Sequence, residues 1–328
     1  MAPVEWVRVS RGEPCAVCGK PDWCTRTRDG AAVCCMRTPG ERSLRNGGWL
    51  HQFVAGTPAC LASSPVDVTG VPRVPASALD RAYRALLAEL DLLPLDRAHL
   101  LGPSRGLSLE AVARNGYRSL PGVGRAALCR SLTARVGSAL DGVPGFYRAA
   151  GRVGEYVCLA GPAGLLIPVR DVDGRVVGLQ VRFAALGRKK YCWVSSAGRP
   201  GGVGSGSPTH VARPIRLRDP GLWVTEGPLK ADIAAQRLGA VVLGIAGTAA
   251  WRSAHTLDVV QALRPSVVTV AFDQDGHPAT FRHASELALA LADTGVRVRL
   301  ALWRRSRGKG IDDVLIGGGV CHTWPFGR

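Results

Sequence analysis

Five of the ten cysteines lie close together near the start of the chain. Cys15 and Cys18 form a CxxC pair, Cys24 follows in PDWC, and the adjacent pair Cys34 and Cys35 closes the segment. Two thiolates from one turn and two from later turns can complete the closed tetrahedral shell of a structural zinc ion. We expect the fourth ligand to be Cys35, which directly precedes the exit from the segment, with Cys34 as the alternative. The alternative to zinc is a redox CxxC or a set of buried thiols.

Three carboxylates stand at the ends of strand-like runs. Glu226 ends LWVTE, and Asp273 and Asp275 follow SVVTVAF. Ligands of open parallel sheets bind beyond the carboxyl ends of the strands, and side chains two apart in an extended segment point the same way. Carboxylate oxygens together with substrate phosphates are the ligands that Mg²⁺ or Mn²⁺ prefers. The sequence therefore predicts a catalytic site for phosphoryl transfer formed by these three acids.

The segment GKGIDDVL, after the last predicted strand, carries further charges. Asp312 is a candidate fourth metal contact, and Lys309 is a candidate charge facing a phosphate. For any single acid the alternative is a helix cap or turn residue, because Asp is favoured in the first turn of a helix. That interpretation also suits Asp232 and Asp313.

Basic side chains gather around a second predicted sheet, with two aromatic residues between them. They are Arg170, Arg182, Arg188, Lys189 and Lys190, with Tyr191 and Trp193. Basic side chains follow a phosphate backbone, and aromatic faces stack on unpaired bases, so the set is typical of single-strand binding. The alternative is a solvated hairpin whose aromatic residues belong to the core.

The elements that position these basic groups are predicted to be helices followed by β-strands. Ser77 is expected to cap a helix over ALDRAYRALLAELDLL, and helical signals recur at SLEAVARNG and GRAALCRSLTARVG. The run LLIPVRDVDGRVVGLQVRF predicts a hairpin that turns at Asp171 to Gly174, and YCWVSS predicts a third strand.

Strands and helices alternate regularly from LWVTE onwards. The runs are LWVTE, PLKADIAAQRLG, AVVLGIAG, a helix around Trp251 to Leu263, SVVTVAFD, FRHASELALALADTG and VRVRLALW. Such alternation predicts an α/β fold with a parallel sheet covered by helices on both faces.

The length and the net charge of the chain limit the classes of function that it can have. A chain of 328 residues suggests two domains, and 42 basic against 25 acidic residues give a net charge of +17. That excess suits a polyanionic partner, although a GC-rich genome explains why all but five of the basic residues are Arg. No apolar run approaches the roughly 18 residues of a membrane helix, and Glu and Arg interrupt the start of the chain. We expect a cytoplasmic protein with no membrane partner.

Three of these motifs resemble parts of the bacterial and phage DNA primases. VTEG followed by AFDQDG is similar to the Toprim domain that these primases share with topoisomerases. The hairpin followed by RKKYCWVSS resembles the basic subdomain of the primase catalytic core, and CAVCGKPDWC with DGAAVCCMR resembles a phage or plasmid primase zinc-binding domain. The resemblance implies a zinc-binding module over 1–55, a flexible linker over 56–76, the N-terminal part of a primase core over 77–220 and a Toprim domain over 221–320.

The resemblance implies roles for several basic residues, but this chain also departs from the family's pattern. Candidate nucleotide- and template-binding residues are Arg170, Arg182, Lys189, Lys190, Lys230 and Lys309. Many primases carry an acidic residue four positions after the Toprim Glu, where this chain has Lys230, and the cellular primase has a His among its zinc ligands where this chain uses Cys. These departures resemble a mobile-element or plasmid variant.

The leading hypothesis is a stand-alone DNA primase. It would make short RNA primers on single-stranded DNA from nucleoside triphosphates, with structural Zn²⁺ and catalytic Mg²⁺ or Mn²⁺, beside a replicative helicase supplied in trans. The first alternative is a Toprim nuclease, because the same acids can direct water at a phosphodiester. The second is a non-catalytic nucleic-acid-binding protein of a mobile element. A topoisomerase would need a nucleophilic Tyr in a partner domain, and none of the five Tyr lies in one that we recognise.

Overall fold

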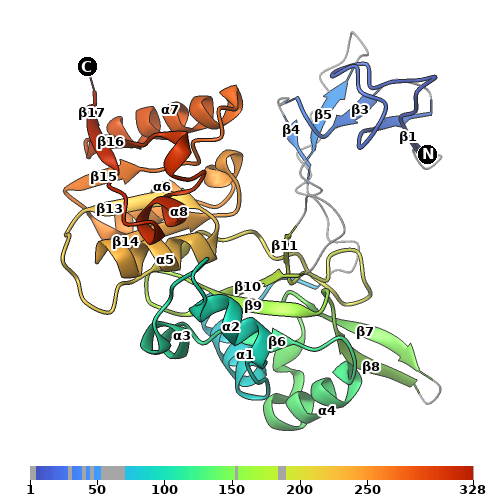
Figure 1. The fold of residues 1–328 in the computed structure, drawn as a ribbon. Coiled ribbons are helices and arrows are strands. Elements are labelled where there is room, and N and C mark those ends of the chain that lie inside the picture. The colour runs from blue at the N-terminus through green and yellow to red at the C-terminus, as the bar shows by residue number, and fades with distance from the viewer. Residues whose placement is uncertain are drawn as a thin grey trace. The chain divides into compact units, whose positions relative to one another are not determined.

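The computed structural model of the chain describes residues 5–28, 32–38, 42–44, 48–52, 71–151, 154–183 and 190–327. The chain divides into two compact units, Met1–Ser64 and Pro65–Arg328 (Figure 1). Arg188, Lys189 and most of the expected linker, up to residue 70, lie outside the described residues.

The described part of the first unit is one antiparallel sheet with strand order β1-β2-β3-β5-β4. The strands are β1 (Trp6–Arg8), β2 (Thr25–Thr27), β3 (Ala32–Cys35), β4 (Arg42–Ser43) and β5 (Trp49–Gln52). Its buried cluster consists of Val9, Cys15, Cys24, Val33 and Cys35. A core of this size supplies little hydrophobic stabilisation, so a unit of this kind needs a further source such as a metal.

The second unit begins with helices packed on an antiparallel sheet of order β11-β10-β9-β6. The strands are β6 (Arg118–Leu120), β9 (Gly164–Arg170), β10 (Val176–Arg182) and β11 (Tyr191–Trp193). The helices are α1 (Ala76–Ala88), α2 (Pro94–Leu101), α3 (Leu109–Asn115) and α4 (Arg125–Val136), the last continued by the 3₁₀ turn η1 (Gly137–Leu140). β7 (Phe146–Gly151) and β8 (Gly154–Leu159) form a separate hairpin.

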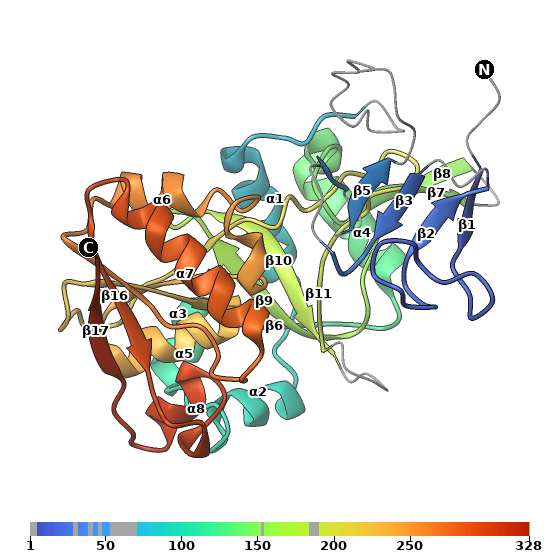
Figure 2. The ribbon, with the colours of Figure 1, turned by 90° about the horizontal axis from the view of Figure 1, so that it is seen from above.

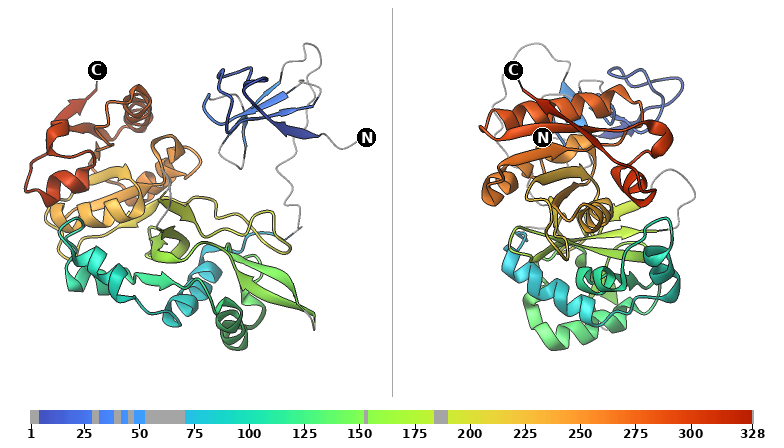
Figure 3. Two further views of the ribbon diagram at one scale, coloured as in Figure 1. Left: turned by 45° about the vertical axis from the view of Figure 1, so that its right-hand side comes forward. Right: turned by 60° about the vertical axis from the view of Figure 1, so that its left-hand side comes forward.

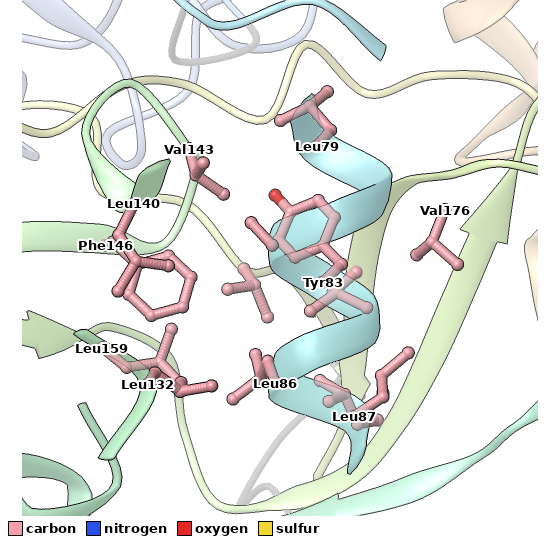
Figure 4. Packing of buried hydrophobic residues seen from close by; sticks show 14 of the residues in the cluster. Leu79, Tyr83, Leu86, Leu87, Leu132, Leu140, Val143, Phe146, Leu159 and Val176 are labelled. Carbon is pink, nitrogen blue, oxygen red and sulfur yellow. The ribbon is translucent and has the colours of Figure 1, made fainter. Parts of the chain in front are cut away.

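Helix α1 anchors this layer through one apolar face. Leu79, Tyr83, Leu86 and Leu87 follow a three- and four-residue spacing and are buried, as the sequence pattern predicts. Figure 4 shows these side chains beside Phe146 and residues of neighbouring elements, within one cluster. The cluster fixes the sheet that carries the predicted basic residues.

The second half of this unit is a sheet of order β12-β14-β13-β15-β16-β17. Its strands are β12 (His210–Ala212), β13 (Leu222–Glu226), β14 (Val241–Ile245), β15 (Val267–Val270), β16 (Arg297–Leu302) and β17 (His322–Phe326). The four inner strands are parallel, and the two edge strands pair antiparallel to them. The carboxyl ends of β13 and β15 are therefore neighbours at one edge of the sheet.

Helices cover both faces of this sheet, as predicted. α5 (Pro228–Leu238) and α8 (Ile311–Ile316) pack in one cluster, and α6 (Thr256–Leu263) and α7 (Pro278–Ala292) pack in the other (Figure 2). Short 3₁₀ turns η2 (Thr248–Trp251) and η3 (Arg305–Arg307) complete the connections. The predicted α/β fold class, a parallel sheet with helices on both faces, is confirmed for the four inner strands. In the described part of the chain, no helix has the length and apolar character needed to cross a membrane.

A buried polar network joins the two halves of the second unit. Asp232 of α5 accepts hydrogen bonds from Tyr117 Oη at 2.5 Å and from His210 Nε2 at 3.1 Å. His210 Nδ1 accepts from the backbone N–H of Arg170 at 3.0 Å, so the proton of its neutral ring lies on Nε2. Tyr117 belongs to an apolar cluster that includes residues of α3, β9 and α5. Figure 3 shows the two halves of the second unit meeting along these elements. The suggestion that Asp232 is a helix cap is wrong, because its carboxylate is bound across this junction.

Several local predictions need correction. Ser77 does not cap α1: the N-cap is Pro75, whose extended backbone leads into the helix and leaves Ser77 inside the first turn. The predicted helix around Trp251 is divided into η2 and α6 by a residue with φ of 52°, His255. Asp313 does act as expected at a helix start, where its side chain accepts from the backbone N–H of Gly310 at 3.0 Å.

Candidate functional site

Four cysteines of the first unit meet in one place. The Sγ atoms of Cys15, Cys18, Cys24 and Cys35 all lie within 4.8 Å of one another. The Sγ of Cys24 lies 3.8 Å from that of Cys18 and 4.0 Å from that of Cys35. A tetrahedral site with Zn–S bonds of about 2.3 Å places its sulfurs about 3.8 Å apart, so the set fits zinc. Cys34 precedes Cys35 on β3, and consecutive strand side chains point to opposite faces, which explains why it is outside the set.

Hydrogen-bond donors surround the cysteine sulfurs. The backbone N–H of Met36 donates to Cys24 Sγ at 3.4 Å, and that of Thr38 donates to Cys35 Sγ at 3.2 Å. Burial alone would raise the pKa of Cys18, but hydrogen bonds from the backbone of Lys20 and from neighbouring cysteines lower it to about 7. Burial would also raise the pKa of Cys35, but backbone donors lower it, which favours the thiolates that bind metal, whereas burial raises the pKa of Cys15 and Cys24.

Two of the predicted carboxylates lie side by side where β13 and β15 end. Ala271 continues β15, since its N–H donates to Val224 O of β13 at 2.8 Å. Two residues later the N–H of Asp273 donates to Glu226 Oε1 at 3.2 Å. The Asp273 side chain is 8% exposed. The parallel register of the two strands therefore brings these acids together, as the sequence predicts.

Two lysines bind the carboxylate of Asp273. Lys230 lies in the first turn of α5 and pairs with Oδ1. Lys309 Nζ lies 3.4 Å from Oδ2 and 3.8 Å from Asp275 Oδ2. The two aspartates thus face the same ammonium group, in agreement with their spacing of two residues. Gly227 has φ of 78° between Glu226 and α5, a conformation that lets the strand turn directly into the helix.

Asp275 is held at the start of α7. Its Oδ1 accepts from the backbone N–H of His277 at 2.9 Å, and its Oδ2 accepts from Thr280 Oγ1 at 3.3 Å. Partial burial works to raise the pKa of Asp275, but these hydrogen bonds and Lys309 lower it. This carboxylate is ionised and 26% exposed, so it can bind a cation from solvent.

Asp312 joins the cluster through a residue that the sequence did not single out. Its side chain is 5% exposed, and its Oδ2 accepts from Arg105 Nη1 at 3.0 Å. Its Oδ1 is buried and has no hydrogen-bond partner in the part of the chain that the structure describes. A Cβ atom at Gly310 would lie 2.9 Å from Lys230 Nζ and would clash with Asp312 Oδ1, so those groups are neighbours. Arg105 lies in the loop between α2 and α3, far from the acids in the sequence, so no sequence pattern connects it with them.

The pKa values show a site that favours added positive charge. Burial raises the pKa of Glu226, and repulsion from Asp273 raises it further against the attraction of Lys230. Burial also raises the pKa of Asp312. For Lys230, burial would lower the pKa, but attraction to Asp273 and Asp312 raises it, and the ammonium is retained. The unpartnered Asp312 oxygen and the crowded carboxylates fit a site for a hard divalent cation.

A cavity of about 200 Å³ opens beside the carboxylates. Asp273 and Asp275 form one side, and Phe281 and Leu302 contribute apolar surface. Phe281 is 64% exposed. The cavity can receive a small flat group next to the cation site.

The predicted basic residues lie in different environments. Arg182 ends β10 and is partly buried, its Nε atom has no hydrogen-bond partner among the described residues, and Lys190 is exposed beside β11. The guanidinium of Arg170 donates to Asn115 O at 2.8 Å next to the Asp232 network. Burial lowers the pKa of His99 to about 4, and nearby Arg182 lowers it as well. Nucleotide or template contact stays a prediction for these basic residues.

Sequence comparison places one family model on the chain. Residues 217–321 match a domain of unknown function, DUF3854, and the match covers β13 to β16 and the acids at their carboxyl ends. No curated protein sequence matches the chain.

Solved structures with a similar fold are bacterial primases. The zinc-binding and RNA polymerase domains of the Aquifex aeolicus primase match with a TM-score of 0.55 and 14% identity, over 76% of this chain and 63% of that one. The RNA polymerase domain of Mycobacterium tuberculosis primase DnaG, in complex with double-stranded DNA, matches with a TM-score of 0.51 and 19% identity, over 74% and 77%. The Escherichia coli primase catalytic core gives 0.51 and 19%, over 74% and 76%.

The chain spans less than two thirds of the Aquifex aeolicus structure. At these identities the similarity is one of fold. The resemblance inferred from the motifs is therefore confirmed at that level: this chain has the fold of the bacterial primase catalytic core.

Proposed function

We propose that the chain is a DNA primase that makes short RNA primers on single-stranded DNA by metal-dependent nucleotidyl transfer. The observation that carries the proposal is the group formed by Glu226, Asp273 and Asp275 at the carboxyl edge of the sheet, within a primase-type fold. A buried acid group of this kind is costly unless it binds cations.

Glu226, Asp273 and Asp275, with Asp312 beside them, would hold Mg²⁺ or Mn²⁺. The bound ion would polarise the primer 3′-hydroxyl and stabilise charge on the departing pyrophosphate. Lys309 is 61% exposed, so it can reach a triphosphate and neutralise its charge. The backbone N–H of Asp273 holds Glu226 in place.

Substrate contacts are proposed on both sides of the acids. The cavity beside Asp273 and Asp275 offers Phe281 as a surface on which a base can stack. Arg182 and Lys190 would contact the template strand or the triphosphate. The Mycobacterium tuberculosis neighbour was solved in complex with DNA, which supports a nucleic-acid substrate for this fold.

The four cysteines of the first unit would hold a structural zinc ion. A module stabilised in this way can help to choose the start site on the template. A replicative helicase acting in trans is the proposed partner that would supply this template.

One assay tests the proposal against its alternatives. The zinc-loaded chain is incubated with single-stranded template, labelled ribonucleoside triphosphates and Mg²⁺ or Mn²⁺. We expect short labelled products whose formation requires both the template and the divalent cation. Cleavage of a labelled oligonucleotide without nucleotides would favour a nuclease, and binding without either reaction would favour a non-catalytic protein. Either of those results would overturn the proposal.

A further inference from the structure

Each oxygen of the Asp273 carboxylate is already paired with the ammonium group of a lysine. Lys230 pairs with Oδ1 and Lys309 with Oδ2. Asp273 is the most buried of the three strand-end acids that the proposed function uses, and its neighbour Glu226 binds the Asp273 backbone. An incoming metal ion therefore meets a carboxylate that is already neutralised on two sides.

The two lysines differ in how firmly they are held. The side chain of Lys230 is 18% exposed, whereas that of Lys309 is 61% exposed. Lys230 leaves a rigid helix turn and passes so close to Gly310 that a Cβ there would lie 2.9 Å from its Nζ. Lys309 can move into solvent and yield to a metal ion or a triphosphate, but Lys230 has little room to move.

Asp312 gives an independent reason for Lys230 to stay in place. Arg105 donates to its Oδ2. Its buried Oδ1 has no hydrogen-bond partner among the residues that the structure describes, and it lies near Lys230 beside Gly310. An ionised oxygen buried in this way needs a positive charge nearby. The Lys230 ammonium supplies it, and electrostatic attraction acts between the two groups.

The net negative charge of the cluster is small, so the cluster can bind few further cations. Four carboxylates, on Glu226, Asp273, Asp275 and Asp312, face three cationic side chains, on Lys230, Lys309 and Arg105. Asp313, next to Asp312, adds one more negative charge, so a single divalent ion is already enough to neutralise the cluster. Two-metal sites for phosphoryl transfer hold their ions about 4 Å apart and depend on carboxylates that are free to bridge or flank them.

We propose that Lys230 is a resident cation, so that this acid cluster binds a single divalent ion. In the reaction Lys230 would act through Asp273 as a positioning residue that supplies fixed positive charge. The role in nucleotidyl transfer rests on the proposed function, but the number of ions bound does not.

The number of bound ions can be counted directly. The zinc-loaded full chain is titrated with Mn²⁺ in the absence of nucleotides, and free Mn²⁺ is measured by electron paramagnetic resonance. We expect one tight Mn²⁺ per chain.

Two substitutions of Lys230 test its role as the resident cation. Lys230→Glu adds a carboxylate and removes the ammonium, so this variant should bind two Mn²⁺ ions. Lys230→Met removes the charge at similar length and should bind its first Mn²⁺ at least about tenfold more tightly.

A matched control reverses charge elsewhere on the same sheet. Arg297 begins β16 at the opposite edge, so Arg297→Glu should still bind one ion with unchanged affinity. Two tight ions or none in the unsubstituted chain would overturn the inference, as would a Lys230→Met variant that binds no more tightly. Zinc content and circular dichroism establish whether each variant is folded. If Lys230→Glu does not fold, the affinity of Lys230→Met for its first Mn²⁺ decides the test. One bound ion without primer synthesis would refute the proposed function alone, whereas primer synthesis with two bound ions would refute this inference alone.

Discussion

Single residues at this site serve structure and chemistry together. Asp273 orders Glu226 through its backbone N–H while its carboxylate binds two lysines. Arg105 reaches the cluster from another part of the chain and neutralises Asp312. The acids were predictable because strand-end position is visible in the sequence. Arg105 was not, because only the folded chain brings its loop to the sheet edge.

Removing the Arg105 side chain should destabilise the second unit. Arg105→Ala leaves the buried Asp312 carboxylate without the guanidinium that donates to its Oδ2, at a cost of about 1.5–3 kcal/mol. Urea unfolding followed by circular dichroism measures this loss. Adding Asp312→Asn should recover part of it, because the uncompensated charge is removed. Arg148→Ala breaks a half-exposed pair with Asp141 and should cost less than about 1 kcal/mol, and an equal loss in both single variants would contradict the argument.

Elements with strong periodicity were predictable, and weakly patterned ones were not. Helix α1 and the hairpin of β9 and β10 follow their apolar patterns. β17 contains Pro325 and has an irregular burial pattern in which Phe326 packs, partly buried, against an apolar cluster, so its sequence carries no strand signal. α2 starts at Pro94 inside an apolar run that the proline interrupts. β12 has three residues, too few to show a period.

A buried polar network contributes to the junction of the two sheets beside its apolar cluster, and Tyr117→Phe tests that contribution. The substitution removes the hydroxyl that donates to Asp232 but keeps the ring, which is fully buried. We expect a loss of about 1–3 kcal/mol in the free energy of unfolding, because a buried carboxylate oxygen loses its donor. Tyr156→Phe on β8, where the side chain is 38% exposed, is the control and should have little effect. Equal stability of the two variants would show that the network does not hold the junction.

At the scale of the whole molecule, the chain joins two units with different sources of stability. The second unit has extended apolar clusters, whereas the buried cluster of the first consists largely of cysteines. The sequence indicated a small metal-dependent module from cysteine spacing alone. The choice between Cys34 and Cys35 depended on strand orientation, which the spacing does not contain.

Zinc removal should therefore unfold the first unit only. A chelator is expected to expose residues before about position 53 to protease while the second unit keeps its helical circular dichroism. Cys18→Ser should lose bound zinc, and Cys34→Ser should retain it, as measured by elemental analysis of the purified chains. Loss of zinc in both variants, or in neither, would contradict the assigned ligand set.

Ribonucleotide incorporation by Asp273→Asn tests the central claim most directly. The substitution keeps the size of the side chain and removes the charge that binds the catalytic cation, while Asp293→Asn at the end of α7 is the matched control. Template-dependent primer synthesis should fall at least about 100-fold in Asp273→Asn and stay unchanged in the control. Synthesis by a folded Asp273→Asn chain at the rate of the unsubstituted protein would contradict the account.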